Sequence, residues 1–230
     1  MRIFLLGVPG SGKDTIRNLL TEKLKDQYPN LYSVDVGTIL RERSKQDQEI
    51  KSDQIAGAIV QSNKVLDIFE EILSCEHFIV SGSPRRKEEA EWITDHSSWK
   101  ANPGELVWLK VTDEEAKARL LARQRSDDTL EVIETRLKQF WEVTLPSINV
   151  FNERGFLNNV TLCNLDKLSP ETICDYILDS VYKEKQSPQT FKCCTCKQEF
   201  SQTMLKLGLD SWHSFATCPR CGSNKTKEVK

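Results

Sequence analysis

The chain has 230 residues, which is enough for one α/β domain and a small additional module. Its 32 basic and 34 acidic residues give a formal net charge of −2, which excludes a globally basic nucleic-acid-binding protein. No apolar run approaches the ~20 residues of a membrane span, and the apolar residues 1–6 lead straight into a glycine-rich segment, unlike a signal peptide. We therefore expect a cytoplasmic protein without a membrane partner.

Strand-like and helix-like segments alternate along most of the chain. Strands are predicted at 2–7, 31–36, 77–82, 105–111 and 156–163, and amphipathic helices at 13–27, 38–46, 53–74, 86–95, 113–124, 128–151 and 169–183. This alternation predicts a three-layer α/β fold over residues 1–183, in which helices cover both faces of a parallel sheet. Residues 184–190 are polar and contain Pro188, which indicates a linker, and the composition changes abruptly in residues 191–230.

A glycine-rich segment directly follows the first predicted strand. Its sequence is G-V-P-G-S-G-K-D-T, and a predicted helix begins at its lysine. Backbone N–H groups of such a turn and of the helix N-terminus point at an anion, the glycines let the backbone approach, and the lysine reaches the outer phosphates. We therefore predict a phosphate-binding loop, or P-loop, for a nucleotide, formed by Gly7, Pro9, Gly10, Ser11, Gly12, Lys13, Asp14 and Thr15.

Further motifs follow the loop in a fixed order. They are V-G-T-I-L-R at 36–41, S-G-S-P-R at 81–85, an arginine-rich block ending in two aspartates at 119–128 with Arg136 eight residues later, and T-L-P-S-I at 144–148. In this order and spacing the chain resembles the adenylate kinases and related nucleoside monophosphate kinases over about residues 1–183. The family has T-G-D-L-L-R and D-G-F-P-R at the first two places. The combination is specific, although each motif alone is not.

This resemblance implies a transferase that moves the γ-phosphoryl group of ATP, bound with Mg²⁺, to a nucleoside monophosphate. Phosphoryl transfer relies on positioning and charge neutralisation, and arginine suits both because its planar fork donates paired hydrogen bonds and stays charged. The implied catalytic residues are Lys13, Arg85, Arg123, Arg125 and Arg136. The implied acceptor-binding residues are Gly37, Arg41, Gly82, Arg85 and Glu89, and Arg119 is implied on the ATP side.

Three departures from the family pattern concern the metal and the lid. Ser81 stands where the family has a strand-end aspartate that holds Mg²⁺, and Asp14 adds a carboxylate in the phosphate loop. Two interpretations are open: Asp14 takes over part of the metal role, or it points to solvent or caps the helix. Only Gln124 separates Arg123 from Arg125, so we predict a very short lid with poorer exclusion of water.

Glu89 leaves the acceptor base open. It stands where adenylate kinases have a glutamine that contacts adenine. A glutamine amide donates to N1 and accepts from the 6-amino group, whereas a glutamate only accepts, which suits the N1–H and 2-amino donors of guanine. The overall resemblance favours AMP, and GMP stays a second acceptor.

The cysteines are concentrated near the C-terminus. Two C-x-x-C pairs there offer four thiolates, which suit a tetrahedral structural Zn²⁺ better than disulfides in a cytoplasmic enzyme. We predict a zinc-ribbon domain at 191–230 with Cys193, Cys196, Cys218 and Cys221 as ligands. Lysines and aromatic residues in this segment leave a protein partner or weak nucleic-acid binding open.

The leading prediction is thus a monomeric adenylate-kinase-like enzyme whose ligands are ATP and a nucleoside monophosphate. The alternative is a nucleotide-binding regulatory or adaptor protein with weakened catalysis and the zinc ribbon as its docking module. Ser81 and the short lid favour this alternative, whereas the full set of arginines opposes it. A kinase for another small phosphate acceptor is a third interpretation.

Overall fold

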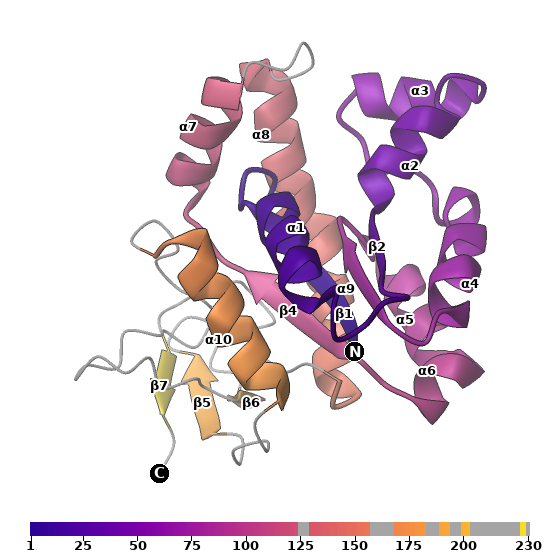
Figure 1. The fold of residues 1–230 in the computed structure, drawn as a ribbon. Helices are drawn as coiled ribbons and strands as arrows, with labels where there is room; N and C mark the ends of the chain where they lie inside the picture. The colour runs from indigo at the N-terminus through magenta and orange to yellow at the C-terminus, as the bar shows by residue number, and fades with distance from the viewer. Residues whose placement is uncertain (124–128, 157–167, 183–188, 194–198, 203–225, 229–230) are drawn as a thin grey trace.

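The structure, a computed structural model, describes residues 1–123, 129–156, 168–182, 189–193, 199–202 and 226–228 (Figure 1). Its main sheet contains β1 (Arg2–Gly7), β2 (Tyr32–Asp35), β3 (Phe78–Ser81) and β4 (Glu105–Leu109) in the order β2-β3-β1-β4. All three pairings are parallel, with Leu5 opposite Ser81 and Val107, and Asp35 opposite Ser81. The predicted parallel sheet is confirmed for these four strands. The predicted strand at 156–163 lies, apart from Phe156, outside the described residues.

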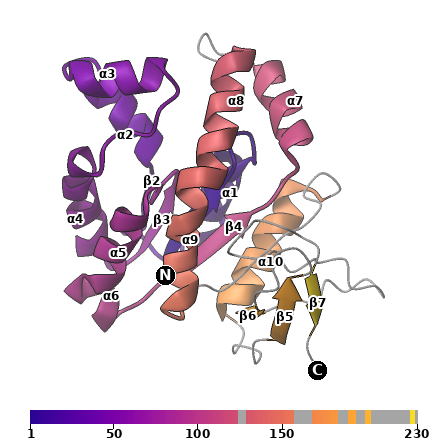
Figure 2. The same cartoon turned by 180° about the vertical axis from the view of Figure 1, so that it is seen from behind.

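Helices cover both faces of this sheet. They are α1 (Lys13–Leu24), α2 (Val36–Arg43), α3 (Gln48–Ile55), the 3-10 helix η1 (Ser62–Lys64), α4 (Leu66–Ser74), α5 (Lys87–Asp95), α6 (Ser97–Ala101), α7 (Asp113–Arg123), α8 (Leu130–Gln139), the π-helix η2 (Phe140–Thr144), α9 (Leu145–Glu153) and α10 (Pro170–Tyr182). Helices α1 and α10 lie on the face seen in Figure 1, and α8 and α9 lie on the face seen in Figure 2. The predicted three-layer arrangement is therefore confirmed.

The alternation of β1 side chains explains the two layers. Ile3 and Leu5 point to one face, where they join buried residues of α1 and α10 such as Leu20 and Ile177. Phe4 and Leu6 point to the other face, where a larger apolar cluster includes residues of α4 to α6, α8 and α9. Successive side chains of a strand face opposite sides, so a strand that is apolar at every position requires helices on both sides.

One predicted helix is wrong and one was missed. The predicted helix at 53–74 is interrupted after α3, because the chain turns at Gly57 with a φ of +69° and resumes through η1 and α4. A left-handed φ favours glycine and ends a helix. The short α6 was not predicted, and the side chain of its N-cap His96 accepts a hydrogen bond from the Ser98 N–H. In contrast, the predicted segment 128–151 forms the continuous run of α8, η2 and α9.

A second, antiparallel sheet lies near the C-terminus. It contains β5 (Gln189–Cys193), β6 (Glu199–Gln202) and β7 (Thr226–Glu228) in the order β6-β5-β7. Strand β5 thus begins within the predicted linker 184–190 and ends on Cys193. The predicted ligands Cys196, Cys218 and Cys221 lie outside the described residues, and the residues that are described contain no cluster suited to a metal ion. The zinc ribbon stays a prediction.

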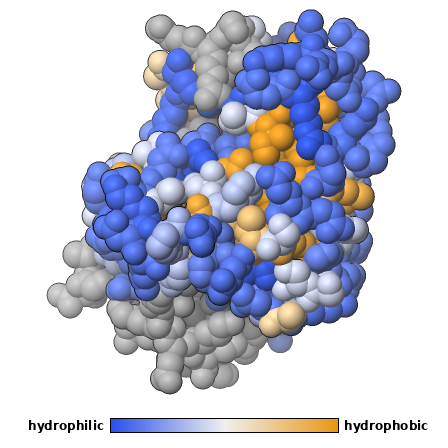
Figure 3. Space-filling view, turned by 45° about the vertical axis from the view of Figure 1, so that its right-hand side comes forward, coloured by the Kyte–Doolittle hydropathy of each residue, from blue (hydrophilic) through white to orange (hydrophobic). Residues whose placement is uncertain are grey.

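Hydrophilic residues cover most of the face in Figure 3, and apolar residues gather in one band on its right-hand side. The large apolar side chains that are exposed in the described part of the chain are Ile55, Leu121 and Leu130. Within the same part, we find no helix with both the length and the apolar character needed to cross a membrane.

Candidate active site

The glycine-rich loop connects β1 to α1 as a tight turn. The Ser11 N–H donates to the Val8 carbonyl at 3.0 Å, and Gly10 and Gly12 have φ values of +85° and +84°. A Cβ on Gly10 would lie 2.7 Å from the Ala116 carbonyl oxygen, so a larger residue does not fit there. Because Gly12 occupies the N-cap of α1 and has no side chain, it cannot cap the first N–H groups of that helix. These groups are the ones a helix N-terminus offers to an anion.

Lys13 is the first residue of α1, and its ammonium lies among charged groups from several elements. Burial lowers the pKa of Lys13, as do the cations Arg85 and Arg123, whereas Asp14 and Asp35 act in the opposite direction. The strand end of β1, the loop and the start of α1 together bring Gly7, Pro9, Gly10, Lys13 and Asp14 to the wall of one cavity of about 200 Å³. The loop residues therefore line one side of this cavity, and the positive charge of Lys13 lies in its wall.

Two carboxylates flank the hydroxyl at the end of β3. Ser81 is fully buried, and its Oγ donates to Oδ1 of Asp14 at 2.8 Å and lies 3.4 Å from Oδ1 of Asp35. Asp14 therefore faces the carboxyl edge of the sheet, which contradicts the interpretation that it simply points to solvent. The parallel register explains the arrangement, because β2 and β3 end side by side at Asp35 and Ser81.

Asp35 is a site residue that the sequence analysis missed. It caps α2, accepts hydrogen bonds from Gly37 N and Thr38 Oγ1 at 3.3 and 2.8 Å, and pairs with Arg41 at 3.1 Å. Burial acts to raise the pKa of Asp35, but the Thr38 hydrogen bond and the cations Arg41, Lys13 and Arg85 keep it below its ordinary value. An aspartate between a strand and a helix is a typical N-cap, and this signal could have identified it.

Arg85 lies in the segment that connects β3 to α5. Its Nε donates to the Gly82 carbonyl at 2.7 Å, and burial lowers the pKa of its guanidinium. Gly82 has a φ of +82°, and a Cβ there would lie 2.8 Å from Asp35 Oδ1. Gly37, Arg41, Gly82 and Arg85 all line the same cavity as the phosphate loop.

The α7 and α8 helices form another wall of this cavity. Arg123 at the end of α7 and Arg136 of α8 both line it, together with Gln139, Phe140 and Thr144, which were not predicted. Lys117 and Glu134 join the two helices by an ion pair of 2.9 Å. The predicted short lid and Arg125 fall on residues 124–128, which lie outside the described residues, so the lid stays a prediction.

Some predicted site residues do not line the cavity. Thr15 is exposed, and Ser11 has a buried Oγ without a hydrogen-bond partner among the described residues. Arg119 pairs with Glu115 along α7 at 2.7 Å. Glu89 is buried behind the cavity wall and bonds to backbone N–H groups. The roles predicted for these residues stay predictions.

Comparison with known proteins agrees with this geometry. A family model described as an AAA domain matches residues 6–134. The adenylate kinase of Salinibacter ruber is 30% identical over 192 residues, covering 68% of this chain and 88% of the relative. Adenylate kinase 1 of a Nostoc species is 32% identical over 162 residues (66% and 85%), and the Leptospira biflexa adenylate kinase is 32% identical over 193 residues (78% and 99%).

The chain belongs to the adenylate kinase family. It is therefore a kinase, and its phosphate loop lies within the matched AAA-domain segment. The pairing of Ser81 with Asp14 lies beside the lysine of this loop, since Asp14 is the next residue in the chain and its charge acts on Lys13.

Proposed function

We propose that this chain transfers the γ-phosphoryl group of ATP to a nucleoside monophosphate, with AMP as the favoured acceptor. One observation carries the proposal: the phosphate loop, the Arg41–Arg85 group and the arginines of α7 and α8 line a single cavity. Two polyanions that meet in line need cations on several sides of the migrating group. The cavity has cations from four helices, α1, α2, α7 and α8, and from the connection between β3 and α5.

In this proposal, each group of residues around the cavity has one role. The loop and Lys13 hold the donor phosphates, and Arg41 and Arg85 hold the acceptor phosphate. Arg123, Arg125 and Arg136 neutralise the charge that develops on the migrating group. Burial is the main cause of the lowered pKa values of Lys13 and Arg85, so bound phosphates would replace the water that these cations have lost.

Mg²⁺ fits the oxygen groups at the carboxyl edge of the sheet. Asp14 lines the cavity and faces Ser81, whereas Asp35 is already engaged by Thr38 and Arg41. Magnesium prefers carboxylate, phosphate and water oxygens. We infer that Asp14 is the main protein group that orients the metal and that Ser81 orients Asp14. When bound, the ion would be held by Asp14 and would neutralise part of the charge of the ATP phosphates.

Asp14→Asn tests this assignment because it retains the size of the side chain and removes its charge. We expect the Mg²⁺ concentration for half-maximal rate to rise roughly tenfold, as for other residues that orient a metal. Calorimetry should also show that Mg²⁺ no longer strengthens ATP binding to the same degree. Asp26→Asn, an exposed aspartate beyond α1, is the control. An unchanged magnesium dependence in both assays would contradict the assignment.

A coupled assay tests the activity itself. Purified chain is given ATP and Mg²⁺ with AMP, GMP, CMP or UMP, and formation of the diphosphate is followed. We expect the highest kcat/KM with AMP, with GMP as the second acceptor. Measurable nucleotide binding without turnover on any acceptor would overturn the proposal.

We also propose that residues 191–230 hold one structural Zn²⁺ through Cys193, Cys196, Cys218 and Cys221. The support is the spacing of the two C-x-x-C pairs, whose four thiolates satisfy a tetrahedral zinc without another ligand. A module of this size depends on its metal for stability. Metal analysis of the purified chain should find about one zinc per molecule, and a folded, zinc-free protein would refute this proposal.

A further inference from the structure

The carboxylate of Glu89 is directed at backbone groups. Glu89 lies in the first turn of α5 and is only 2% exposed. Its Oε2 accepts hydrogen bonds from the N–H groups of Arg85 and Arg86 at 2.7 and 3.3 Å. Its Oε1 lies 3.4 Å from Ser62 Oγ, a hydroxyl that also lies 3.1 Å from Oε1 of Glu88. Both carboxylate oxygens thus face polar groups of the protein.

The hydrogen bonds of Glu89 join two walls of the cavity. One wall carries Arg85, and the other consists of Ile59 and Val60, which lead into Ser62. The guanidinium of Arg86 strengthens this connection, since it donates to the Ile59 carbonyl at 2.9 Å and lies 3.4 Å from the Val60 carbonyl oxygen. A shift of Glu89 would therefore move both walls relative to each other.

We propose that Glu89 is a positioning residue, which fixes the backbone of Arg85 and the Ile59–Ser62 wall for any nucleoside monophosphate and does not read the base. This inference rests on the proposed function, because it assigns the same cavity to the acceptor. It replaces the hypothesis that Glu89 selects guanine. Because its carboxylate is buried and accepts from two backbone N–H groups, a base could reach it only after those bonds had broken.

The electrostatic setting agrees with a structural task for this carboxylate. Burial raises the pKa of Glu89, while the Arg85 and Arg86 N–H groups and their guanidinium charges oppose that rise. The free-energy cost of burying the Glu89 carboxylate is thus offset by hydrogen bonds and charges of Arg85 and Arg86, whose backbone the carboxylate also holds in place. Removing the Glu89 carboxylate would leave the backbone N–H groups of Arg85 and Arg86 without this acceptor, and the backbone of Arg85 would lose its fixed position.

Glu89→Ala and Glu89→Gln separate the two roles. A glutamine can still accept from both backbone N–H groups with its one oxygen and donate to Ser62 Oγ, so it should preserve the geometry. We expect Glu89→Ala to raise the KM for AMP and for GMP alike, roughly ten- to a hundredfold, with an unchanged KM for ATP. Glu89→Gln should restore most of the affinity without altering the ratio of kcat/KM for AMP and GMP.

Two further variants serve as controls for this test. Glu91→Ala removes a carboxylate from the same helix that pairs with Lys87, and it should leave both KM values unchanged. Ser62→Ala removes the hydroxyl that Glu88 and Glu89 share and leaves both backbone hydrogen bonds of Glu89 in place, so it should raise the acceptor KM less than Glu89→Ala. This variant covers the case in which Glu89→Ala fails to fold. A change of base preference in Glu89→Gln would overturn this inference alone. Absence of turnover by the wild-type chain would instead overturn the proposed function.

Discussion

Lys13→Met is expected to lower kcat/KM by about 10³-fold or more, because it removes the one lysine of the phosphate loop. Methionine retains the length of the side chain and its apolar stem, so the loss reports the ammonium. Lys13 also balances Asp14 and Asp35, whose carboxylates would otherwise repel incoming phosphates. The coupled assay gives kcat/KM, and calorimetry gives the affinity for ATP, which should fall as well.

A matched control is Lys25→Met, which removes a lysine just beyond the other end of α1. Lys25 is exposed and pairs with Glu22, so its loss should leave activity within about twofold, as for a surface ion pair. If Lys13→Met retained a tenth or more of the wild-type kcat/KM, the role of the lysine as the principal donor-phosphate cation would be refuted.

Trp99→Ala should lower the free energy of unfolding by ~3–5 kcal/mol, the cost typical of truncating a buried tryptophan. Trp99 is fully buried, and its ring lies 5.7 Å, centroid to centroid, from those of Phe4, Phe151 and Phe156. Its indole N–H has no hydrogen-bond partner among the described residues, so the loss comes from packing and the resulting cavity. Urea denaturation followed by circular dichroism measures the change.

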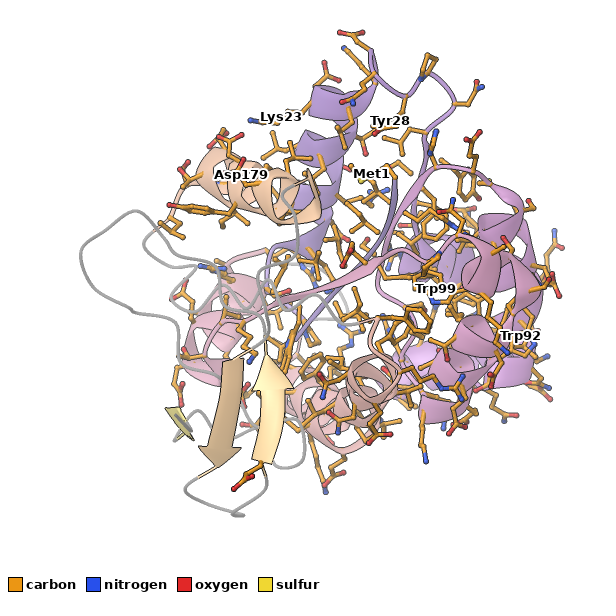
Figure 4. The ribbon with its side chains drawn as sticks, turned by 90° about the horizontal axis from the view of Figure 1, so that it is seen from below. Met1, Lys23, Tyr28, Trp92, Trp99 and Asp179 are labelled. Atoms are coloured by element: carbon orange, nitrogen blue, oxygen red, sulfur yellow. The ribbon has the colours of Figure 1, made fainter. Side chains whose placement is uncertain are left out.

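Trp92 offers the comparison within the same layer of helices. It is partly buried at the surface of the cluster, where it contacts Phe69 and His96, and Figure 4 places it at the rim while Trp99 lies further inside. Trp92→Ala should therefore cost clearly less, about 1–2 kcal/mol. Equal losses for the two substitutions would contradict the view that Trp99 is the centre of this core.

The pairing of Asp14 with Ser81 bears on the proposed metal site. The resemblance to the family implies a metal-binding aspartate at the strand-end position, and in this chain a serine at that position donates to a carboxylate from α1. A carboxylate from α1 thus lies beside Ser81 at the carboxyl edge of the sheet. Its position there is why the Asp14→Asn experiment is informative about magnesium.

Features that depend on neighbouring residues could be predicted from the sequence. The alternation of segments predicted the parallel sheet, and the glycines before Lys13 predicted a tight turn that leads into a helix. Both follow from local chemistry. Side chains of an apolar strand point alternately to its two faces, and glycine adopts the left-handed φ of Gly10 and Gly12 without steric cost. The interruption at Gly57 was not predicted, because the segments on both sides have helical periodicity and one left-handed residue between them does not change that pattern.

The directions of the polar side chains were decided only by the tertiary structure. Asp14 and Ser81 meet because α1 packs beside β3, and Asp35 joins them because the parallel register aligns the ends of β2 and β3. Glu89 faces inward because the start of α5 offers it two N–H groups that no linear pattern shows. The sequence by itself therefore determined which chemical groups are available, and their roles depend on donors that only folding brings within hydrogen-bond distance.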